Sequence, residues 1–154
     1  MQIRRAVAGD VTAVRAVVEA AYALYVPRIG REPAPMTADY ESLVAGGGVW
    51  VGETDGRVLG VLVIRASDDV LELENVAVDP AAQGLGHGRA LVRFAESRAR
   101  ELGLEAVELY TNEAMVENVQ LYPRLGFVET ERRVEDGYRR VYFRKTLDAG
   151  ELRR

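Results

Sequence analysis

The sequence contains no cysteine and only one histidine. The missing thiols exclude disulfide bonds, thiolate metal sites and a cysteine nucleophile. No apolar run approaches the roughly 18–20 residues of a membrane-spanning helix, and residues 1–5 (MQIRR) lack the apolar core of a signal peptide. From these absences we expect a cytoplasmic protein that does not contact a membrane.

Basic residues are too few to suggest a nucleic-acid partner. The 154 residues include 20 Lys and Arg against 24 Asp and Glu, a formal net charge of −4, whereas nucleic-acid-binding domains usually carry a basic face. A content of 48% hydrophobic and 29% charged residues is typical of a globular domain with a real core. We expect one domain over residues 1–147, followed by a charged tail over residues 148–154 that frays.

The spacing of apolar residues predicts a mixed α/β domain. Helical spacing begins at Val11 and runs to Tyr25, and Pro27 is expected to end that helix. Three consecutive strands follow a short helix, and a crossover helix comes next, so the order is not a regular dinucleotide-fold alternation. The remaining elements are expected at residues 104–111 (strand), 114–125 (helix), 127–133 (strand) and 138–145 (strand).

A glycine-rich segment, QGLGHG at residues 83–88, joins the third of those strands to the crossover helix. Glycines leave backbone N–H groups uncovered, and a helix N-terminus is electropositive, so such a segment can hold a phosphate or pyrophosphate. Arg89 stands where a dinucleotide fingerprint needs its third glycine, and the Gly-Lys-Ser/Thr ending of a P-loop is absent. On the glycines alone, a tight turn that binds nothing remains the alternative.

Two motifs together resemble the GCN5-related N-acetyltransferase (GNAT) family. They are VAVDPAAQGLGHGRAL at residues 76–91 and, about thirty residues later, NVQLYPRLGF at residues 118–127. The element order also fits, so the resemblance covers nearly the whole chain. It implies a single-domain fold with a mixed central sheet of about six to seven strands and flanking helices. It also implies an acyltransferase that uses acetyl-CoA as co-substrate, without a metal.

The resemblance assigns acetyl-CoA to the first motif. Backbone amides of the glycine segment would bind the pyrophosphate, and the preceding strand, with a β-bulge, would pair with the pantetheine arm. Met115 stands where the family often has an asparagine, so Asn118 and Asn112 are the nearby candidates for that contact. The implied cofactor-binding residues are Val76, Val78, Gln83, Gly84, Leu85, Gly86, His87, Gly88, Arg89 and Asn118.

Direct transfer to an amine requires a proton donor for the leaving thiolate and an acceptor for the amine proton. A thiol has a pKa of ~8.5, so a modest acid suffices, and Tyr122 matches the family's tyrosine acid. The alternative role for Tyr122 is as a core residue. Glu72 and Glu74, two residues apart, share one strand face unless a bulge intervenes. Either could accept the amine proton, and a solvated strand edge is the alternative for each.

The sequence does not identify the acceptor amine. Tyr25, Arg28 and Arg31 stand where the family builds its acceptor wall, and Asn75 could orient the acceptor. Arginines there suggest an acidic group on a small-molecule or peptide amine, although charged loops are more often merely solvated. The last two strands offer edges for the homodimer common in the family. The alternative function is a non-catalytic acyl-CoA-binding or sensing module on the same fold.

Overall fold

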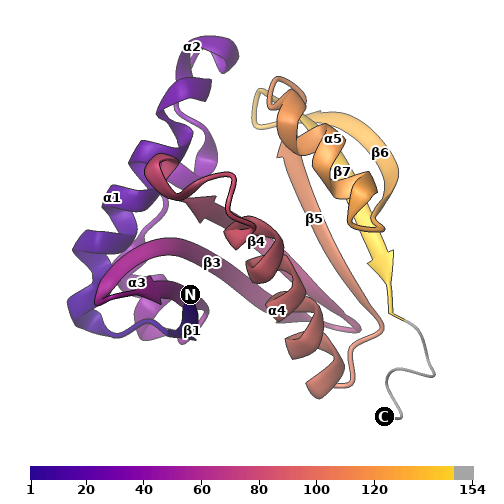
Figure 1. The fold of residues 1–154 in the computed structure, drawn as a ribbon. Helices are drawn as coiled ribbons and strands as arrows, with labels where there is room; N and C mark the ends of the chain where they lie inside the picture. The colour runs from indigo at the N-terminus through magenta and orange to yellow at the C-terminus, as the bar shows by residue number, and fades with distance from the viewer. Residues whose placement is uncertain (148–154) are drawn as a thin grey trace. The chain divides into compact units, whose positions relative to one another are not determined.

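The computed structural model describes residues 1–147. Within this range a mixed sheet has the strand order β1-β2-β3-β4-β5-β7-β6 (Figure 1). Strands β4 and β5 pair in parallel, whereas the β1–β2, β2–β3, β5–β7 and β6–β7 pairs are antiparallel. The predicted α/β class and mixed sheet are therefore confirmed. The strands are β1 (Gln2–Arg5), β2 (Val49–Thr54), β3 (Arg57–Ser67), β4 (Val70–Val78), β5 (Ala106–Asn112), β6 (Val128–Glu135) and β7 (Tyr138–Thr146).

The helices and strands belong to two compact units. The first unit comprises Met1–Arg65 and Glu74–Arg93, and the second comprises Ala66–Leu73 and the chain from Phe94 onward. The α-helices are α1 (Val11–Tyr22), α2 (Val26–Ile29), α3 (Tyr40–Ala45), α4 (His87–Glu101) and α5 (Val116–Arg124). Strand β4 and helix α4 thus contribute residues to both units. The tail predicted at residues 148–154 lies outside the described residues.

The first helical region of the first unit differs from the prediction. Helix α1 ends at Tyr22 instead of continuing to Tyr25, and α2 begins at Val26. Pro27 lies in the first turn of α2, where the missing N–H has no intrahelical acceptor to lose. The prediction that Pro27 ends a helix is wrong, because this proline starts one. Arg28 consequently lies on α2 instead of in a loop.

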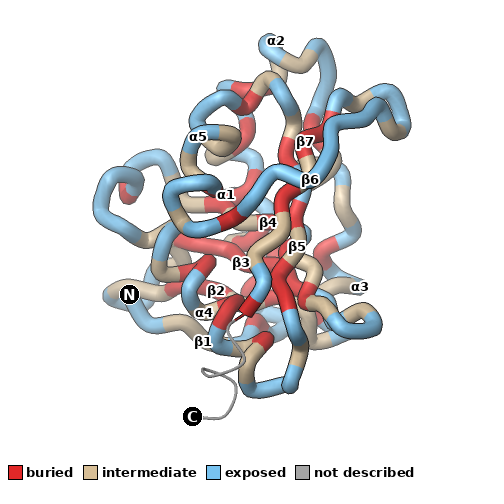
Figure 2. The backbone as a smooth tube through the Cα atoms, turned by 90° about the vertical axis from the view of Figure 1, so that its right-hand side faces the viewer, coloured by how far each residue is buried: buried red, intermediate tan, exposed pale blue. Residues whose placement is uncertain are grey.

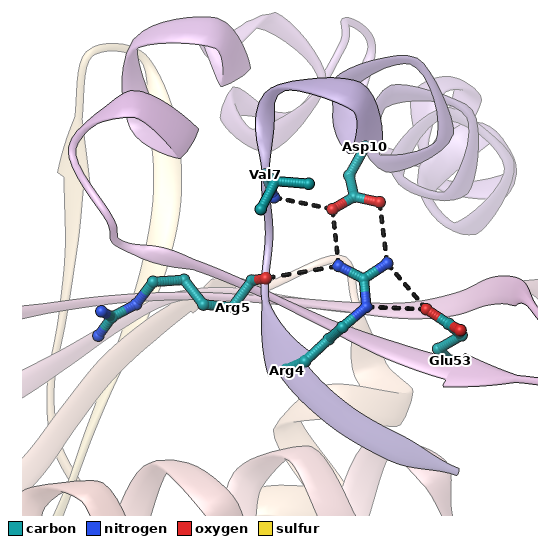
Figure 3. A network of polar contacts seen from close by, with 5 residues as sticks. All are labelled: Arg4, Arg5, Val7, Asp10 and Glu53. Carbon is teal, nitrogen blue, oxygen red and sulfur yellow. Dashed lines mark hydrogen bonds and ion pairs between the residues drawn. The ribbon is translucent and has the colours of Figure 1, made fainter.

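Three charged residues fix the N-terminus of α1 in the first unit (Figure 3). Arg4 on β1 donates hydrogen bonds to both carboxylate oxygens of Asp10, at 2.8 and 3.0 Å, and to Glu53 on β2 at 2.8 Å. Asp10 also accepts a hydrogen bond from the Val7 amide at 2.8 Å. The fork geometry of the guanidinium suits this bidentate contact. The hydrogen bond from Arg4 is the main reason that the pKa of Asp10 lies below its usual value.

In the second unit, α5 packs against β7 through aromatic rings. The Tyr122 ring lies 5.6 Å from that of Phe127 and 5.7 Å from that of Phe143, between ring centroids. Helix α5 begins at Val116, two residues later than predicted, and ends at Arg124 directly after Pro123. Pro123 therefore lies inside α5, one position before its last residue. Figure 2 shows β6 exposed along nearly its whole length, as expected of an edge strand.

No helix within residues 1–147 is both long enough and apolar enough to cross a membrane.

Candidate functional site

The glycine segment leaves a run of backbone donors without acceptors. In the described part of the chain, no group accepts a hydrogen bond from the amides of residues 84–89; the first amide of this region with a partner is that of Ala90, which donates to the Gly86 carbonyl at 3.0 Å. Helix α4 begins at His87, so these amides surround its electropositive N-terminus. The arrangement suits an anion with several oxygen atoms.

Two glycines create this arrangement. Gly84 and Gly86 have φ angles of 83° and 84°, in the left-handed region that L side chains rarely adopt. A Cβ atom at either position would meet no atom within 4 Å. A side chain there would therefore project into open space. This open space is what a bound pyrophosphate requires, so the predicted cofactor-binding segment fits the group implied by the resemblance.

Side chains near the glycine segment form hydrogen bonds with the backbone of the segment and of β4. The Asp79 carboxylate accepts a hydrogen bond from the Ala81 amide at 2.9 Å. The Gln83 side chain donates to the Val78 carbonyl at 3.2 Å, and the Val76 carbonyl accepts from the Tyr22 hydroxyl at 3.1 Å. The carbonyls of Val76 and Val78, the two residues predicted to contact the pantetheine arm, thus already accept a protein hydrogen bond. Each carbonyl retains a second lone pair.

Charge at the loop comes from Arg89, which is exposed and makes no ion pair with any described residue. His87, the first residue of α4, and Gly88 are partly exposed, whereas Leu85 has 71% of its surface exposed. No group of three or more metal-ligating side chains gathers among residues 1–147. The available chemistry at the loop is therefore that of backbone amides and one guanidinium.

A buried hydrogen-bond network surrounds Asn75 in the first unit. The Asn75 carbonyl oxygen accepts from the Tyr22 hydroxyl at 2.6 Å, and its amide nitrogen donates to the Tyr40 hydroxyl at 3.0 Å. Asn75 is 5% exposed, and burial raises the pKa of Tyr40 to about 12. Both tyrosines were missed by the sequence analysis. The stripe Val14, Val18, Tyr22 has helical spacing and could have revealed the first of them.

The residues predicted for the acceptor wall lie partly together. The Tyr25 ring is 6.3 Å from the Tyr22 ring, and the Arg28 guanidinium carbon is 5.2 Å from the centre of the Tyr25 ring. Arg31 follows Gly30, which caps α2 with a φ of 91°. Through Tyr22, the structure therefore links Tyr25 to Asn75.

The two candidate bases have different surroundings. Exposure alternates along β4, and Glu72 and Glu74 are more exposed than Leu71, Leu73 and Asn75. Glu74 forms a 2.8 Å ion pair with Arg65 on β3, within the first unit. Glu72 belongs to the second unit and lies opposite Glu108 of β5 in the parallel pairing. A proton taken up by Glu74 would weaken its ion pair with Arg65.

Tyr122 lies in the second unit with its hydroxyl group unpaired. The residue is 6% exposed, burial raises the pKa of its hydroxyl to about 12, and no hydrogen bond joins this hydroxyl to any described residue. Within residues 1–147, the Thr54 hydroxyl is the one fully enclosed side-chain polar atom without a hydrogen-bond partner. The Tyr122 hydroxyl therefore reaches the molecular surface, where it can donate to a ligand.

Asn118 lies one turn before Tyr122 on α5. Its side-chain amide donates to the Thr111 hydroxyl at 3.4 Å, and Thr111 in turn contacts the sulfur of Met115 at 3.6 Å. Met115 is buried and precedes the helix without a side-chain cap. The Asn118 side-chain oxygen has no donor among the described residues and can accept one from a ligand.

The sequence profile of the Acetyltransferase (GNAT) family matches residues 14–127. A mycothiol acetyltransferase of Thermomonospora curvata is 41% identical over 81 residues, which cover 52% of this chain and 27% of the relative. A mycothiol acetyltransferase of Tsukamurella paurometabola is 34% identical over 137 residues, which cover 81% of this chain and 47% of the relative. The chain thus spans about a quarter to a half of the length of these relatives.

A solved structure has the same fold over almost the whole chain. The yncA protein of Salmonella typhimurium, determined with its cofactor acetyl-CoA, superposes with a TM-score of 0.73 at 25% sequence identity. The superposition covers 96% of this chain and 94% of that protein. The profile match extends over most of the chain and includes both sequence motifs. The chain therefore belongs to the GNAT family of acetyltransferases.

Proposed function

We propose that the protein transfers the acetyl group of acetyl-CoA directly to a primary amine. The observation that supports this function best is the run of unpaired amides at residues 84–89, at the start of α4. Family membership supports the same cofactor, because a relative of the same fold was determined with acetyl-CoA. The relatives are named as acetyltransferases, so the alternative of a non-catalytic acyl-CoA-binding module gains no support from them.

The chain offers a binding group for each part of the cofactor. The amides of residues 84–89 would hold the pyrophosphate, with Arg89 as an additional cation. Backbone groups of Val76 and Val78 would contact the pantetheine arm, and the Asn118 side-chain oxygen would accept a hydrogen bond from it. Bound acetyl-CoA would supply the thioester that the amine attacks.

Tyr122 would assist departure of the thiolate. Its hydroxyl has no protein partner, and a pKa of about 12 keeps it protonated at physiological pH. Complete transfer of this proton to a thiolate whose thiol has a pKa of ~8.5 is uphill by roughly 5 kcal/mol. Tyr122 would therefore act mainly by donating a hydrogen bond to the leaving sulfur.

Glu72 or Glu74 would remove the proton from the amine, directly or through a water molecule. Glu74 would have to do so while its carboxylate pairs with Arg65. Separate Glu72→Gln and Glu74→Gln variants decide between them, because loss of the base lowers kcat/KM most at low pH, where the amine is fully protonated. Normal pH profiles for both variants would exclude both roles.

Release of the free thiol of coenzyme A over a panel of primary amines tests the function. The panel includes peptides, amino acids, polyamines and the acceptor of mycothiol acetyltransferases. We expect release with at least one amine, and acceptor contacts from Tyr25, Arg28, Arg31 or Asn75. Binding of acetyl-CoA without release for any amine would favour the non-catalytic module. The cytoplasmic location, the single domain over residues 1–147 and the homodimer remain predictions.

A further inference from the structure

A buried arginine in the second unit is not used by the proposed reaction. Arg140 on β7 has a side chain that is only 8% exposed. Its guanidinium carbon lies 4.2 Å from the centre of the Tyr110 ring and 5.5 Å from that of Tyr138. Contact with aromatic rings stabilises a guanidinium, but it does not satisfy the N–H donors of the group.

Those donors lack hydrogen bonds. No hydrogen bond joins the Arg140 guanidinium to any described residue, and its one ion pair, with Glu135, is 3.6 Å long. The Thr54 hydroxyl is the sole fully enclosed side-chain polar atom without a partner in residues 1–147, so the Arg140 nitrogens must reach the surface. A guanidinium with five donors that is held in place and reaches the surface can donate them to water or to a ligand.

Glu135 is already engaged by other groups. It accepts a hydrogen bond from the Tyr142 hydroxyl and pairs with Arg133 at 3.2 Å. Arg133 in turn pairs with Glu131 at 3.2 Å. The two arginines and two glutamates of this group balance in charge. Because this group has no excess of positive charge, a dianion such as phosphate would be disfavoured more strongly than a monoanion.

Asn112 adds a second donor at the same place. It lies directly opposite Arg140 in the antiparallel β5–β7 pairing, so the two side chains share one face of the sheet. The Asn112 side-chain oxygen accepts from the Ala114 amide at 2.9 Å, which orients the side-chain NH2 group. This NH2 group has no acceptor among the described residues.

We propose that Arg140 and Asn112 bind a carboxylate of the amine acceptor, so that the acceptors of this protein are amines that carry a carboxylate group. This inference rests on the proposed acetyl transfer for the identity of the ligand as acceptor. The anion site itself rests only on the geometry around Arg140. The carboxylate would accept hydrogen bonds from the guanidinium edge and from the Asn112 NH2 group, and Tyr110 and Tyr138 would exclude water from one side.

Matched pairs of amines test the specificity. β-Alanine is compared with β-alaninamide, and glycylglycine with glycylglycinamide, in the coenzyme A release assay. We expect a higher kcat/KM for each acid than for its amide. An Arg140→Gln variant should have a kcat/KM about ten- to hundredfold lower for the acids and little changed for the amides, because it loses a charge-assisted hydrogen bond. The control is Arg139→Gln, which changes the adjacent exposed arginine on the opposite face and should leave the acid-to-amide ratio unchanged.

A binding measurement on the unaltered protein separates the two proposals. The Nε–H resonance of Arg140 is followed by NMR during titration with acetate, acetamide or inorganic phosphate at constant ionic strength. We expect a saturable shift with acetate, none with acetamide and a smaller one with phosphate. A shift with acetate but no acetyl transfer to any amine would refute the proposed function and retain the anion site. Acetyl transfer without a preference for acids, together with no shift with acetate, would overturn the anion site. A larger shift with phosphate than with acetate would mean that the site binds phosphate and not a carboxylate.

Discussion

Burial determines what Tyr122 can contribute to the reaction. Its hydroxyl has a pKa of about 12 and does not ionise over the pH range in which an enzyme of this kind works. We predict that Tyr122→Phe lowers kcat by about ten- to thousandfold, because the variant lacks the hydroxyl that stabilises the leaving thiolate. The shape of the kcat profile between pH 6 and 10 should not change.

The comparison of the two pH profiles is the measurement, and circular dichroism of the variant serves as the folding control. Phenylalanine retains the ring that packs on Phe127 and Phe143, so the packing is preserved. A basic limb present in the unaltered enzyme and absent from the variant would mean that Tyr122 titrates near neutral pH. That result would contradict the hydrogen-bonding role.

Gly86 shows how a backbone conformation can encode a binding site. A Gly86→Ala change adds a methyl group within the run of unpaired amides, on a residue with a φ of 84°, which costs about 1–2 kcal/mol of strain. We predict about tenfold weaker coenzyme A binding by isothermal titration calorimetry. Gly103→Ala is the matched control, because Gly103 has a φ of 71° and equally open surroundings just beyond the C-terminus of α4.

Both glycine variants should lose a similar amount of thermal stability, since the strain is the same in kind. Only the Gly86 change should weaken coenzyme A binding. Equal weakening by both variants would attribute the effect to general destabilisation and remove the amides from the cofactor site.

At the scale of elements, the Arg4 network joins β1, β2 and the start of α1. The pKa of Asp10 is lower in the folded protein than its usual value of 3.8. Asp10 therefore contributes stability that is complete above about pH 4 and is lost as the pH falls through its lower folded-state pKa. We predict that Asp10→Asn lowers the free energy of unfolding at pH 7 by about 1–2 kcal/mol, a modest value because Arg4 is partly solvated.

Urea unfolding at pH 7 and at progressively lower pH measures this contribution. The difference between the unaltered protein and the Asp10→Asn variant should shrink only below pH 4. A difference that disappears already between pH 5 and 7 would show that the Asp10 carboxylate is not the titrating group.

Asn75 joins β4 to α1 and α3. We predict that Asn75→Leu lowers the free energy of unfolding by about 1–3 kcal/mol, because two tyrosine hydroxyls lose a buried partner. Thermal unfolding measures the loss. A variant of unchanged stability that binds acceptors less well would contradict this structural role and favour direct contact between Asn75 and the acceptor.

The same network shows where sequence analysis stops. The glycine segment and the order of helices and strands along the chain depend on local signals, so they could be predicted. Asn75 lies 53 residues from Tyr22 and 35 from Tyr40 in the chain, and no local pattern predicts that their side chains meet. The break after Tyr22 could not be predicted either, because the apolar spacing continues to Tyr25 and Pro27 is acceptable in the first turn of a helix.

At the scale of the whole molecule, cofactor binding and folding are linked by mass action. A ligand that binds only the folded chain adds about 2.7 kcal/mol at a concentration one hundred times its Kd, or about 5–10 °C in Tm for a protein of this size. We predict such a rise with coenzyme A and with acetyl-CoA, although the net charge of the chain is −4. Attraction of the anionic cofactor would come from the local amides and Arg89, because the net charge is unfavourable. ATP tests whether the site selects coenzyme A: it carries phosphates but no pantetheine arm, so it should raise the Tm much less. An equal rise with ATP would mean that the glycine segment binds phosphates without selecting coenzyme A.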